Sequence, residues 1–470
     1  MDYNKMPVNS FNHFLLSWMP DKSKLKRPYY LTVANALEAD IVSGKLASGT
    51  RLPPQRELAD FLDLNFTTIT QAYDLCRERK LIYGVTGRGT FVSPLPGKNI
   101  ISGRTGRGRD LIELGLVKGF DKIRTPILEA SENVLKKGYI SELYSYTDIA
   151  GHLHQRAAGA HWMKQMDVHT DSEHTAIFSG AQNIISAALL SLFRIGDKIA
   201  TDEFTYSNLI GMAHLSHIRL IPVKGDEYGM RGDELESICR REGVRGIFLM
   251  PNCANPTTCT IPEKRKDELA AVIAENKLVL IEDDNTGIPL ITEGNYHSMF
   301  SRLPEQTIYI CNSTMVLCNG LRVAFAAFPE TFREQLLNAL FYLNIKTSSL
   351  DAEIMTELIL SGKAAKLLQQ KTESAKERNR VFDRYFPEAA VPGSPAAFFR
   401  WLPLPELKVD EMETERLLLQ QNVNVYCSYR FTVTRNPHSF MRIAVSSPDS
   451  TEDLEKGCAI IRDFIGNNRL

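Results

Sequence analysis

Residues 51–73 read RLPPQRELADFLDLNFTTITQAY, and this stretch determines the fold of the N-terminal part of the chain. Pro54 suits the first turn of a short helix, because a backbone N–H has no partner there in any case. A tight break follows at residues 63–65, where Asn65 can cap another helix that runs to about Arg79. Two helices joined by a three-residue turn form a helix-turn-helix, whose second helix enters the DNA major groove by its N-terminal end.

The flanking residues extend this pattern to a small DNA-binding domain. Residues 30–43 carry apolar side chains at helical spacing, and Gly44 can end that helix. Residues 81–92 predict a two-stranded hairpin whose glycines permit a tight tip, which makes a wing for the minor groove or the DNA backbone. A small helical domain that only packs on the rest of the chain is the alternative. The basic and short polar residues that we expect at the DNA are Arg51, Arg56, Asn65, Thr67, Thr68, Thr70, Gln71 and Arg88.

Composition is that of an ordinary globular protein. The chain has 470 residues, of which 43% are apolar and 24% charged, and its eight cysteines include no C-x-x-C pair. No apolar stretch is long enough to span a membrane, and the start does not resemble a secretory signal, so we expect a cytoplasmic protein without disulfides. His152, His154 and His161 have no acidic or cysteine partner at a familiar spacing, so no metal is predicted.

Charge and composition also suggest how the chain is divided. Residues 1–110 carry about six more basic than acidic side chains, which points mildly to a nucleic-acid partner. Residues 94–110 combine proline, glycine and spaced arginines with few apolar side chains, as a flexible linker does. We therefore expect a DNA-binding domain at residues 1–93, a basic linker at 94–110 and a larger domain at 111–470.

The larger domain has the pattern of an α/β fold around a largely parallel sheet. Short apolar runs alternate in part with helical stretches at residues 183–193 and 263–275. The runs lie at residues 176–178, 246–250, 278–281, 308–310 and 323–328. In such folds the loops beyond the carboxyl ends of the strands bind ligands.

Those loops carry polar residues in a consistent order. Residues 179–182 read S-G-A-Q between a strand and a helix start, where free backbone N–H groups suit a phosphate. Tyr206 can stack on a planar ring, Asn255 offers an amide at a turn, and residues 282–284 end a strand with acidic groups. Arg322 then supplies a cation for phosphate or carboxylate. Each feature alone is also explained by capping or turn chemistry, but five in this order indicate a ligand site.

Both parts resemble known families. The first resembles the GntR family of winged-helix repressors through L-P-P-x-R-x-L-A, T-x-x-x-A-Y and G-R-G-T-F-V. The second resembles fold-type-I pyridoxal-phosphate enzymes of the aspartate aminotransferase group, and the whole chain resembles MocR-type regulators, which are typically dimers. For a cofactor, the resemblance implies a phosphate site at Gly180, Ala181, Gln182 and Arg322, ring contacts from Tyr206, Asn255 and Asp283, and a carboxylate-binding Arg442.

The departures from the family pattern indicate the mechanism. Alignment on Gly320-Leu321-Arg322 places Met315 where the family has its Schiff-base lysine, and a thioether cannot form an imine or transfer a proton. Phe66 replaces a common arginine of the recognition helix. In the ligand site, Asn285, Asn312 and Thr258 replace a tyrosine, a serine and a glycine.

We therefore expect a DNA-binding homodimer that senses a small ligand and does not catalyse transamination. Three ligand states remain open: noncovalent pyridoxal or pyridoxamine phosphate, a preformed adduct of the cofactor with an amino acid, or a different carboxylate. The alternatives are a working aminotransferase and a repressor whose larger domain is a ligand-free dimerisation scaffold.

Overall fold

A computed structural model of the chain describes residues 17–42, 45–46, 50–78, 81–85, 89–92, 111–294, 296–312, 316–389, 395–433 and 438–470. The chain forms two compact units, Met1–Pro96 and Gly97–Leu470. The predicted DNA contact Arg88, the predicted linker at 94–110 and Met315 lie outside the described residues.

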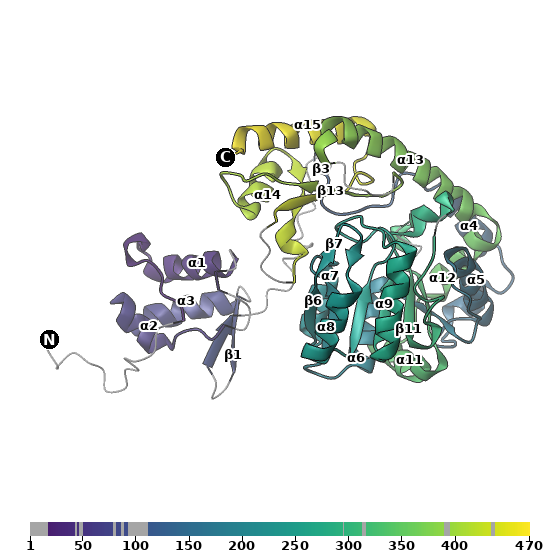
Figure 1. Ribbon diagram of the computed structural model, residues 1–470, viewed down its shortest axis with the longest axis horizontal. Coiled ribbons are helices and arrows are strands. Elements are labelled where there is room, and N and C mark those ends of the chain that lie inside the picture. Colours follow the sequence, from purple (N-terminus) through teal and green to yellow (C-terminus); the bar gives the residue numbers. More distant parts are fainter. Residues whose placement is uncertain are drawn as a thin grey trace. The chain divides into compact units, whose positions relative to one another are not determined.

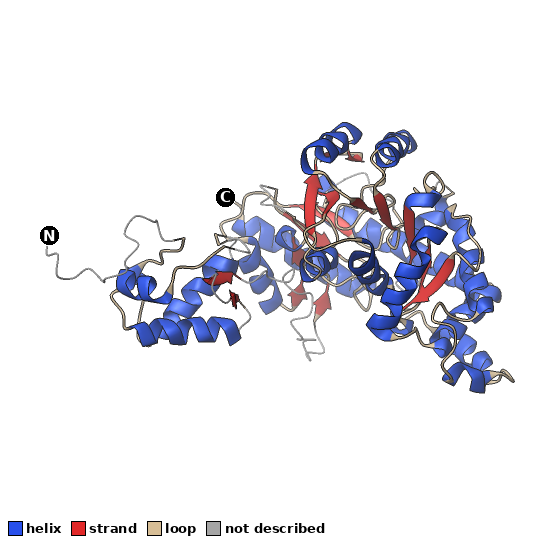
Figure 2. Cartoon of the chain, turned by 90° about the horizontal axis from the view of Figure 1, so that it is seen from below, coloured by secondary structure: helices blue, strands red, loops and turns tan. Residues whose placement is uncertain are grey.

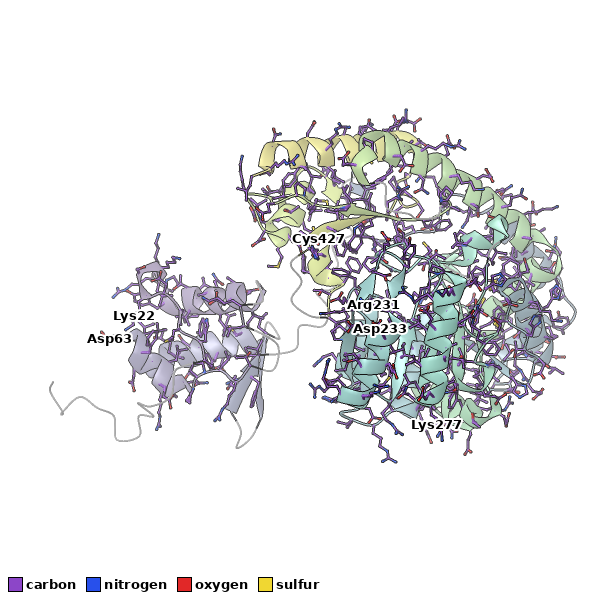
Figure 3. All side chains as sticks on the ribbon, in the orientation of Figure 1. Lys22, Asp63, Arg231, Asp233, Lys277 and Cys427 are labelled. Carbon is purple, nitrogen blue, oxygen red and sulfur yellow. The ribbon has the colours of Figure 1, made fainter. Side chains whose placement is uncertain are left out.

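The smaller unit is the predicted winged helix-turn-helix. Helix α1 (Tyr29–Val42) and α3 (Phe66–Glu78) share a core with α2 (Gln55–Leu62), and β1 (Ile82–Val85) pairs antiparallel with β2 (Gly89–Val92), as Figure 1 shows. The turn after α2 begins at Asp63 (labelled in Figure 3), whose φ of 56° lies in the left-handed region. Aspartate tolerates this conformation better than most residues, so the tight break predicted at 63–65 forms here.

The larger unit is built on a sheet whose described strands number seven, in the order β4-β12-β11-β10-β9-β5-β6. All pairs are parallel except those of β12, which runs antiparallel to β11 and β4. The fold class predicted from the sequence is confirmed, and residues 323–328 supply the antiparallel strand. The strands are β4 (Thr175–Phe178), β5 (Lys198–Asp202), β6 (Arg219–Val223), β9 (Gly246–Leu249), β10 (Val279–Asp283), β11 (Thr307–Cys311) and β12 (Ala324–Ala327).

Helices cover both faces of this sheet. On β4, Ile177 points into one apolar cluster while Ala176 and Phe178 point into another, as alternating side chains of a strand buried on both faces must. Figure 2 shows the strands with helices packed around them. The helices are α4 (Thr125–Leu135), α5 (Leu153–Met163), α6 (Ala181–Leu192), α7 (Ser207–Leu215), α8 (Gly232–Glu242), α9 (Glu263–Glu275), α11 (Glu330–Asn344) and α12 (Ser349–Leu360).

The C-terminal part of the larger unit is a small antiparallel sheet with its own helices. Its strands are ordered β13-β16-β15, and Cys427 of β15 is buried there (Figure 3). Strand β3 (Ile112–Glu113) pairs in parallel with β14 (Val423–Asn424), so the first described residues of this unit lie beside its last strands. The remaining elements are β7 (Gly225–Asp226), β8 (Gly229–Met230), α13 (Lys363–Tyr385), β13 (Arg400–Pro403), α14 (Glu411–Gln420), β15 (Tyr426–Cys427), β16 (Phe440–Ile443) and α15 (Thr451–Asn468).

No helix among the described residues is long and apolar enough to cross a membrane.

Candidate ligand site and DNA-binding face

The turn before α6 places a cation beside backbone N–H groups. Gly180 is the N-cap residue of α6 with a φ of 87°, and no side chain caps that helix end. The positive φ favours glycine at this position, and a Cβ atom built on Gly180 would lie 3.0 Å from Cζ of Arg322, so the guanidinium lies close against the turn. Arg322 is exposed and has no ion-pair partner among the described residues. Free N–H groups, the helix dipole and this guanidinium together suit an anion.

Ser179 adds a hydroxyl group next to this turn, and sequence reasoning did not single out its partners. Its Oγ accepts from Nδ2 of Asn344 over 2.6 Å and lies 3.3 Å from Oγ1 of Thr347. Both partners come from the end of α11 and the loop after it, more than 160 residues away. Nothing in the local sequence pattern of residues 344–347 indicates this contact.

Tyr206 and Gln182 meet at the next strand end. Tyr206 is the N-cap residue of α7, and its hydroxyl accepts from Nδ2 of Asn208 over 2.9 Å and from Nε2 of Gln182 over 3.4 Å. Burial, with a smaller effect from the charge of Asp283, raises the pKa of Tyr206 to about 12. Tyr206 is thus held by two amide groups at this strand end.

Of the three acidic residues that end β10, two already have partners. Glu282 accepts from the backbone N–H groups of Met299 and Phe300 over 2.7 and 2.8 Å. Asp284 accepts from Nδ2 of Asn252 over 2.7 Å and from the hydroxyl of Tyr296. Both carboxylates thus stabilise the fold.

Asp283 has little to satisfy its charge. It is only 3% exposed and accepts one long bond, from the backbone N–H of Asn285 over 3.4 Å. Burial raises the pKa of its carboxyl to about 7. Oδ1 of Asn285 is also buried and lacks a hydrogen-bond partner in the described structure. Two adjacent buried acceptors without a strong donor suggest that a ligand supplies one.

Arg442 is a buried cation with an incomplete set of partners. Its Nη1 donates to Oδ1 of Asn255 over 2.9 Å, and its Nη2 donates to the carbonyl of Gly115. The guanidinium lies 4.8 Å from the ring centre of Phe431 and 5.7 Å from that of Tyr426. Its Nε is buried without a hydrogen-bond partner in the described structure, and burial lowers the pKa of Arg442 to about 10. A carboxylate ligand would satisfy both the charge and the free N–H.

Of the lysines that could replace the Schiff-base amine, Lys346 is already hydrogen-bonded and Lys264 is exposed. Nζ of Lys346 donates to Oγ1 of Thr147 over 2.6 Å and to the hydroxyl of Ser349. Lys264 lies in the first turn of α9 and is exposed. Neither is in contact with Tyr206, Asn255 or Asp283 in any hydrogen bond found among the described residues.

In the smaller unit, the N-terminal end of α3 presents the predicted polar residues. Oδ1 of Asn65 accepts from the backbone N–H of Thr67 over 3.1 Å, which is the expected N-cap geometry. Asn65, Thr67 and Gln71 are exposed. Thr68 is half-buried, as is Thr70, whose hydroxyl donates to Oε1 of Gln55 over 2.9 Å, so Thr70 also holds α3 against α2.

Two of the predicted arginines, Arg51 and Arg56, are exposed near α3 and the wing. An open groove lies beside the N-terminal part of α3. Arg56 is exposed and lies 5.8 Å from the ring centre of Phe66, whereas the side chain of exposed Arg51 lies against Gly89, the first residue of β2. The groove is one that sequence reasoning missed, and it is lined by Arg27, Pro28, Tyr29, Tyr30, Thr68 and Gln71.

Comparisons with known proteins match both units. The family described as "Aminotransferase class I and II" matches residues 120–461, and "Bacterial regulatory proteins, gntR family" matches residues 29–92. The chain is 33% identical to the HTH-type transcriptional regulator YdeF of Bacillus subtilis (strain 168), over 98% of this chain and 99% of that one. It is 22% identical to the protein MocR of Rhizobium meliloti, over 76% of each chain.

Among solved structures, the fold is similar to that of LysN, an alpha-aminoadipate aminotransferase from Thermus thermophilus. The TM-score is 0.67 at 21% identity, over 76% of this chain and 93% of LysN. Fold and comparisons together define a transcriptional regulator with an N-terminal GntR helix-turn-helix and an aminotransferase-like domain. The chain belongs to the MocR-type subfamily of the GntR family, as its motifs predicted.

Proposed function

We propose that this DNA-binding regulator senses a small anionic ligand that its aminotransferase-like domain binds without a covalent bond and does not transaminate. The observation that carries the proposal is Arg442, a buried guanidinium with a free Nε and no carboxylate partner among the described residues. The ligand class is pyridoxal phosphate, pyridoxamine phosphate, an adduct of either with an amino acid, or another carboxylate.

The unsatisfied groups fit a ligand of this kind. Gly180, Ala181 and Arg322 would hold a phosphate, and Tyr206 would stack on the ring with Gln182 orienting its hydroxyl. Asp283 would accept from a protonated ring nitrogen, Asn255 would contact the ring hydroxyl, and Arg442 would bind an amino-acid carboxylate. When bound, a pyridoxal-type group supplies an electron sink for amino-acid chemistry. The structure of LysN contains N-(5'-phosphopyridoxyl)-L-leucine, one molecule that joins phosphate, ring and carboxylate.

The sequence argues against turnover. Met315 occupies the position of the Schiff-base lysine, and transamination requires an amine that bonds to the cofactor and moves a proton. Lys346 is held by Thr147 and Ser349, and Lys264 is exposed on α9, so neither offers a replacement. A site that retains binding groups without the nucleophile is suited to sensing.

We infer a homodimer from an apolar surface at the end of α11. Tyr342 is 83% exposed, and Phe341, Leu343 and Ile345 beside it are also exposed. Nζ of Lys346 bonds to Oγ1 of Thr147, so the segment that carries the exposed Tyr146 contacts the residues just after α11. Contiguous exposed aromatic side chains mark an interaction site, and a second copy would cover them. Sedimentation of the full chain should give the mass of two chains; the mass of one chain at micromolar concentration would contradict the dimer.

Sensing requires that ligand binding alters DNA binding. The domain division inferred from the sequence assigns residues 1–93 to DNA binding, residues 94–110 to a basic linker and residues 111–470 to ligand binding. A ligand can shift DNA affinity only if it binds differently to the states that do and do not fit the operator. In a dimer, the quantity that changes is the spacing or freedom of the two DNA-binding units.

A calorimetric titration tests ligand binding. The purified full chain is titrated with pyridoxal phosphate, pyridoxamine phosphate and N-(5'-phosphopyridoxyl)-L-amino acids. We expect saturable binding of at least one of them that is lost in Arg322→Ala and retained in Arg333→Ala, which removes an arginine from α11 instead. Absence of heat from every ligand with folded protein would favour the ligand-free scaffold. Conversion of an amino acid to its keto acid would favour the enzyme.

A further inference from the structure

A second cavity in the larger unit lies outside the site described above. Its volume is about 190 Å³, which leaves room for several water molecules at roughly 30 Å³ each. Three segments form its walls, namely residues 118–123, helix α13 and residues 446–451. None of the residues assigned to the phosphate, the ring or Arg442 lines it.

The buried member of its charged lining is Arg378, which is 8% exposed. Its Nη1 donates to the carbonyls of Val445 and Pro448 over 3.1 and 2.8 Å, and its Cζ lies 5.0 Å from the ring centre of Phe120. No hydrogen bond from Nε or Nη2 and no ion pair of Arg378 occurs in the part of the chain that the structure describes. The guanidinium thus has backbone acceptors and an aromatic ring but no ion pair within 4 Å among the described residues. The carboxylates of Glu377, Asp449, Glu452 and Asp453 act on it only from a longer distance.

Two of the other buried arginines have a carboxylate partner that Arg378 does not have among the described residues. Arg156 lies 3.4 Å from the carboxylate of Asp148, and Arg400 lies 2.7 Å from that of Asp383. Arg378 and Arg442 have no carboxylate within 4 Å among the described residues. Arg378 lines the cavity, and Nε of Arg442 is buried without a hydrogen-bond partner. Because a buried charge is costly unless it is paired, the two arginines without carboxylates are the ones positioned to bind an anion from solution.

The rim of the cavity limits the kind of anion. Lys122 pairs with Asp449 over 3.4 Å, and Asp121 accepts from Nδ2 of Asn319 over 3.2 Å, so two of the three acids that line the cavity already have partners. Lys118 is a further cation, and Glu377, the third acid, is exposed on α13. A single negative charge is favoured at Arg378, while several charges would be repelled by the three carboxylates. Those carboxylates also tolerate an ammonium group at the rim.

We propose that this cavity binds a small monocarboxylate, of the size of a free amino acid, through the guanidinium of Arg378. The proposal does not depend on whether a phosphate-bearing ligand binds at Arg322 and Arg442, because none of the residues proposed to hold that ligand lines the cavity. It gives the regulator a second input, which is a plain carboxylate that lacks the phosphate and the aromatic ring.

The test is a calorimetric titration of the full chain with acetate, glycine and L-serine, each alone, and with inorganic phosphate, in a buffer without carboxylates. We expect saturable binding of at least one carboxylate in the wild type. Arg378→Gln removes the cation, and Ser374→Trp fills the cavity from α13 without removing a charge. Arg378→Gln should weaken binding about ten-fold or more, as expected for the loss of a charged hydrogen bond. Ser374→Trp should weaken it by a similar factor, because the indole takes the space of the ligand. Arg384→Gln, which changes an exposed arginine of the same helix, should leave binding unchanged.

Three results would overturn the proposal. Folded wild type that binds none of the carboxylates has no such site. Carboxylate binding that survives Ser374→Trp but is lost in Arg442→Gln belongs to the other site. Binding of inorganic phosphate alone would show that the cavity selects a different anion. A matching thermal unfolding midpoint of Ser374→Trp and wild type shows that the variant is folded.

Discussion

Nη1 of Arg442 donates to the amide oxygen of Asn255 over 2.9 Å, across 187 residues of sequence. The cation proposed to bind a carboxylate and the amide proposed to contact the ring hydroxyl therefore contact each other directly. The carbonyl of Gly115 holds the other end of the guanidinium. An arginine fixed in this way loses little freedom when a ligand binds, which favours affinity without a covalent bond.

Arg442→Gln should separate the carboxylate from the rest of the ligand. We expect affinity for an N-(5'-phosphopyridoxyl)-amino acid to fall by roughly 30-fold or more, because a charge pair of this kind is worth about 2–5 kcal/mol when one partner is removed. Affinity for pyridoxamine phosphate, which has no carboxylate, should change by less than about three-fold. Calorimetry of both ligands measures the difference, and an equal loss for both would show that Arg442 only supports the fold.

Met315→Lys should allow covalent capture of pyridoxal phosphate. A lysine amine at this position can bond to the aldehyde, whereas the methionine thioether cannot. We expect borohydride treatment to add the mass of the reduced cofactor to the variant and not to the wild type. Met315→Leu is the control for a change of shape alone. An added mass on the wild type would reveal another reactive lysine and weaken the noncovalent account.

Asp283→Asn should change how stability depends on pH. Burial raises the pKa of Asp283 in the folded protein to about 7, above its ordinary value of 3.8. The folded state therefore keeps a proton that the unfolded chain releases, so the stability contributed by Asp283 falls as pH rises from about 4 to 7. The unfolding free energy of the wild type should fall over this range relative to the variant, by at most about 4 kcal/mol. Parallel curves for the two proteins in denaturant titrations would contradict the assignment.

Gln71→Ala should weaken operator binding, because this exposed side chain lies on the recognition helix beside the groove at Tyr30. A lost base contact costs about 1–3 kcal/mol and relaxes the preference at one base pair. Arg77→Ala is the matched control, since Arg77 lies near the other end of α3 and pairs with Asp74. A stronger effect of Arg77→Ala than of Gln71→Ala would indicate that DNA contacts the C-terminal end of α3 and would contradict the prediction.

Helix and strand positions were predictable where apolar spacing is regular. The three helices of the smaller unit begin and end within about a residue or two of the predicted bounds, since their apolar positions repeat at helical spacing. The direction of β12 was not predictable, because a short buried strand has the same apolar pattern in parallel and antiparallel pairs.

Contacts between distant residues account for what the sequence could not reveal about the site. Motif order suggested Asp283 among three adjacent acids, but only the folded structure shows that Glu282 and Asp284 accept short hydrogen bonds and that Asp283 accepts none. Ser179 is held by Asn344, and Arg442 by Gly115, through folding rather than through local sequence. The sequence does not distinguish Arg378 from other helical arginines. Only the structure shows that it is buried, with backbone acceptors and no ion pair among the described residues.

The most direct test of the sensing claim is the coupling between ligand and operator. DNA affinity of the full chain is measured at fixed salt with and without a saturating phosphopyridoxyl-amino acid, and ligand affinity is measured with and without DNA. Both affinities should change by the same factor, within roughly 5- to 150-fold, because such coupling is reciprocal. Ligand binding that leaves operator affinity unchanged would contradict it.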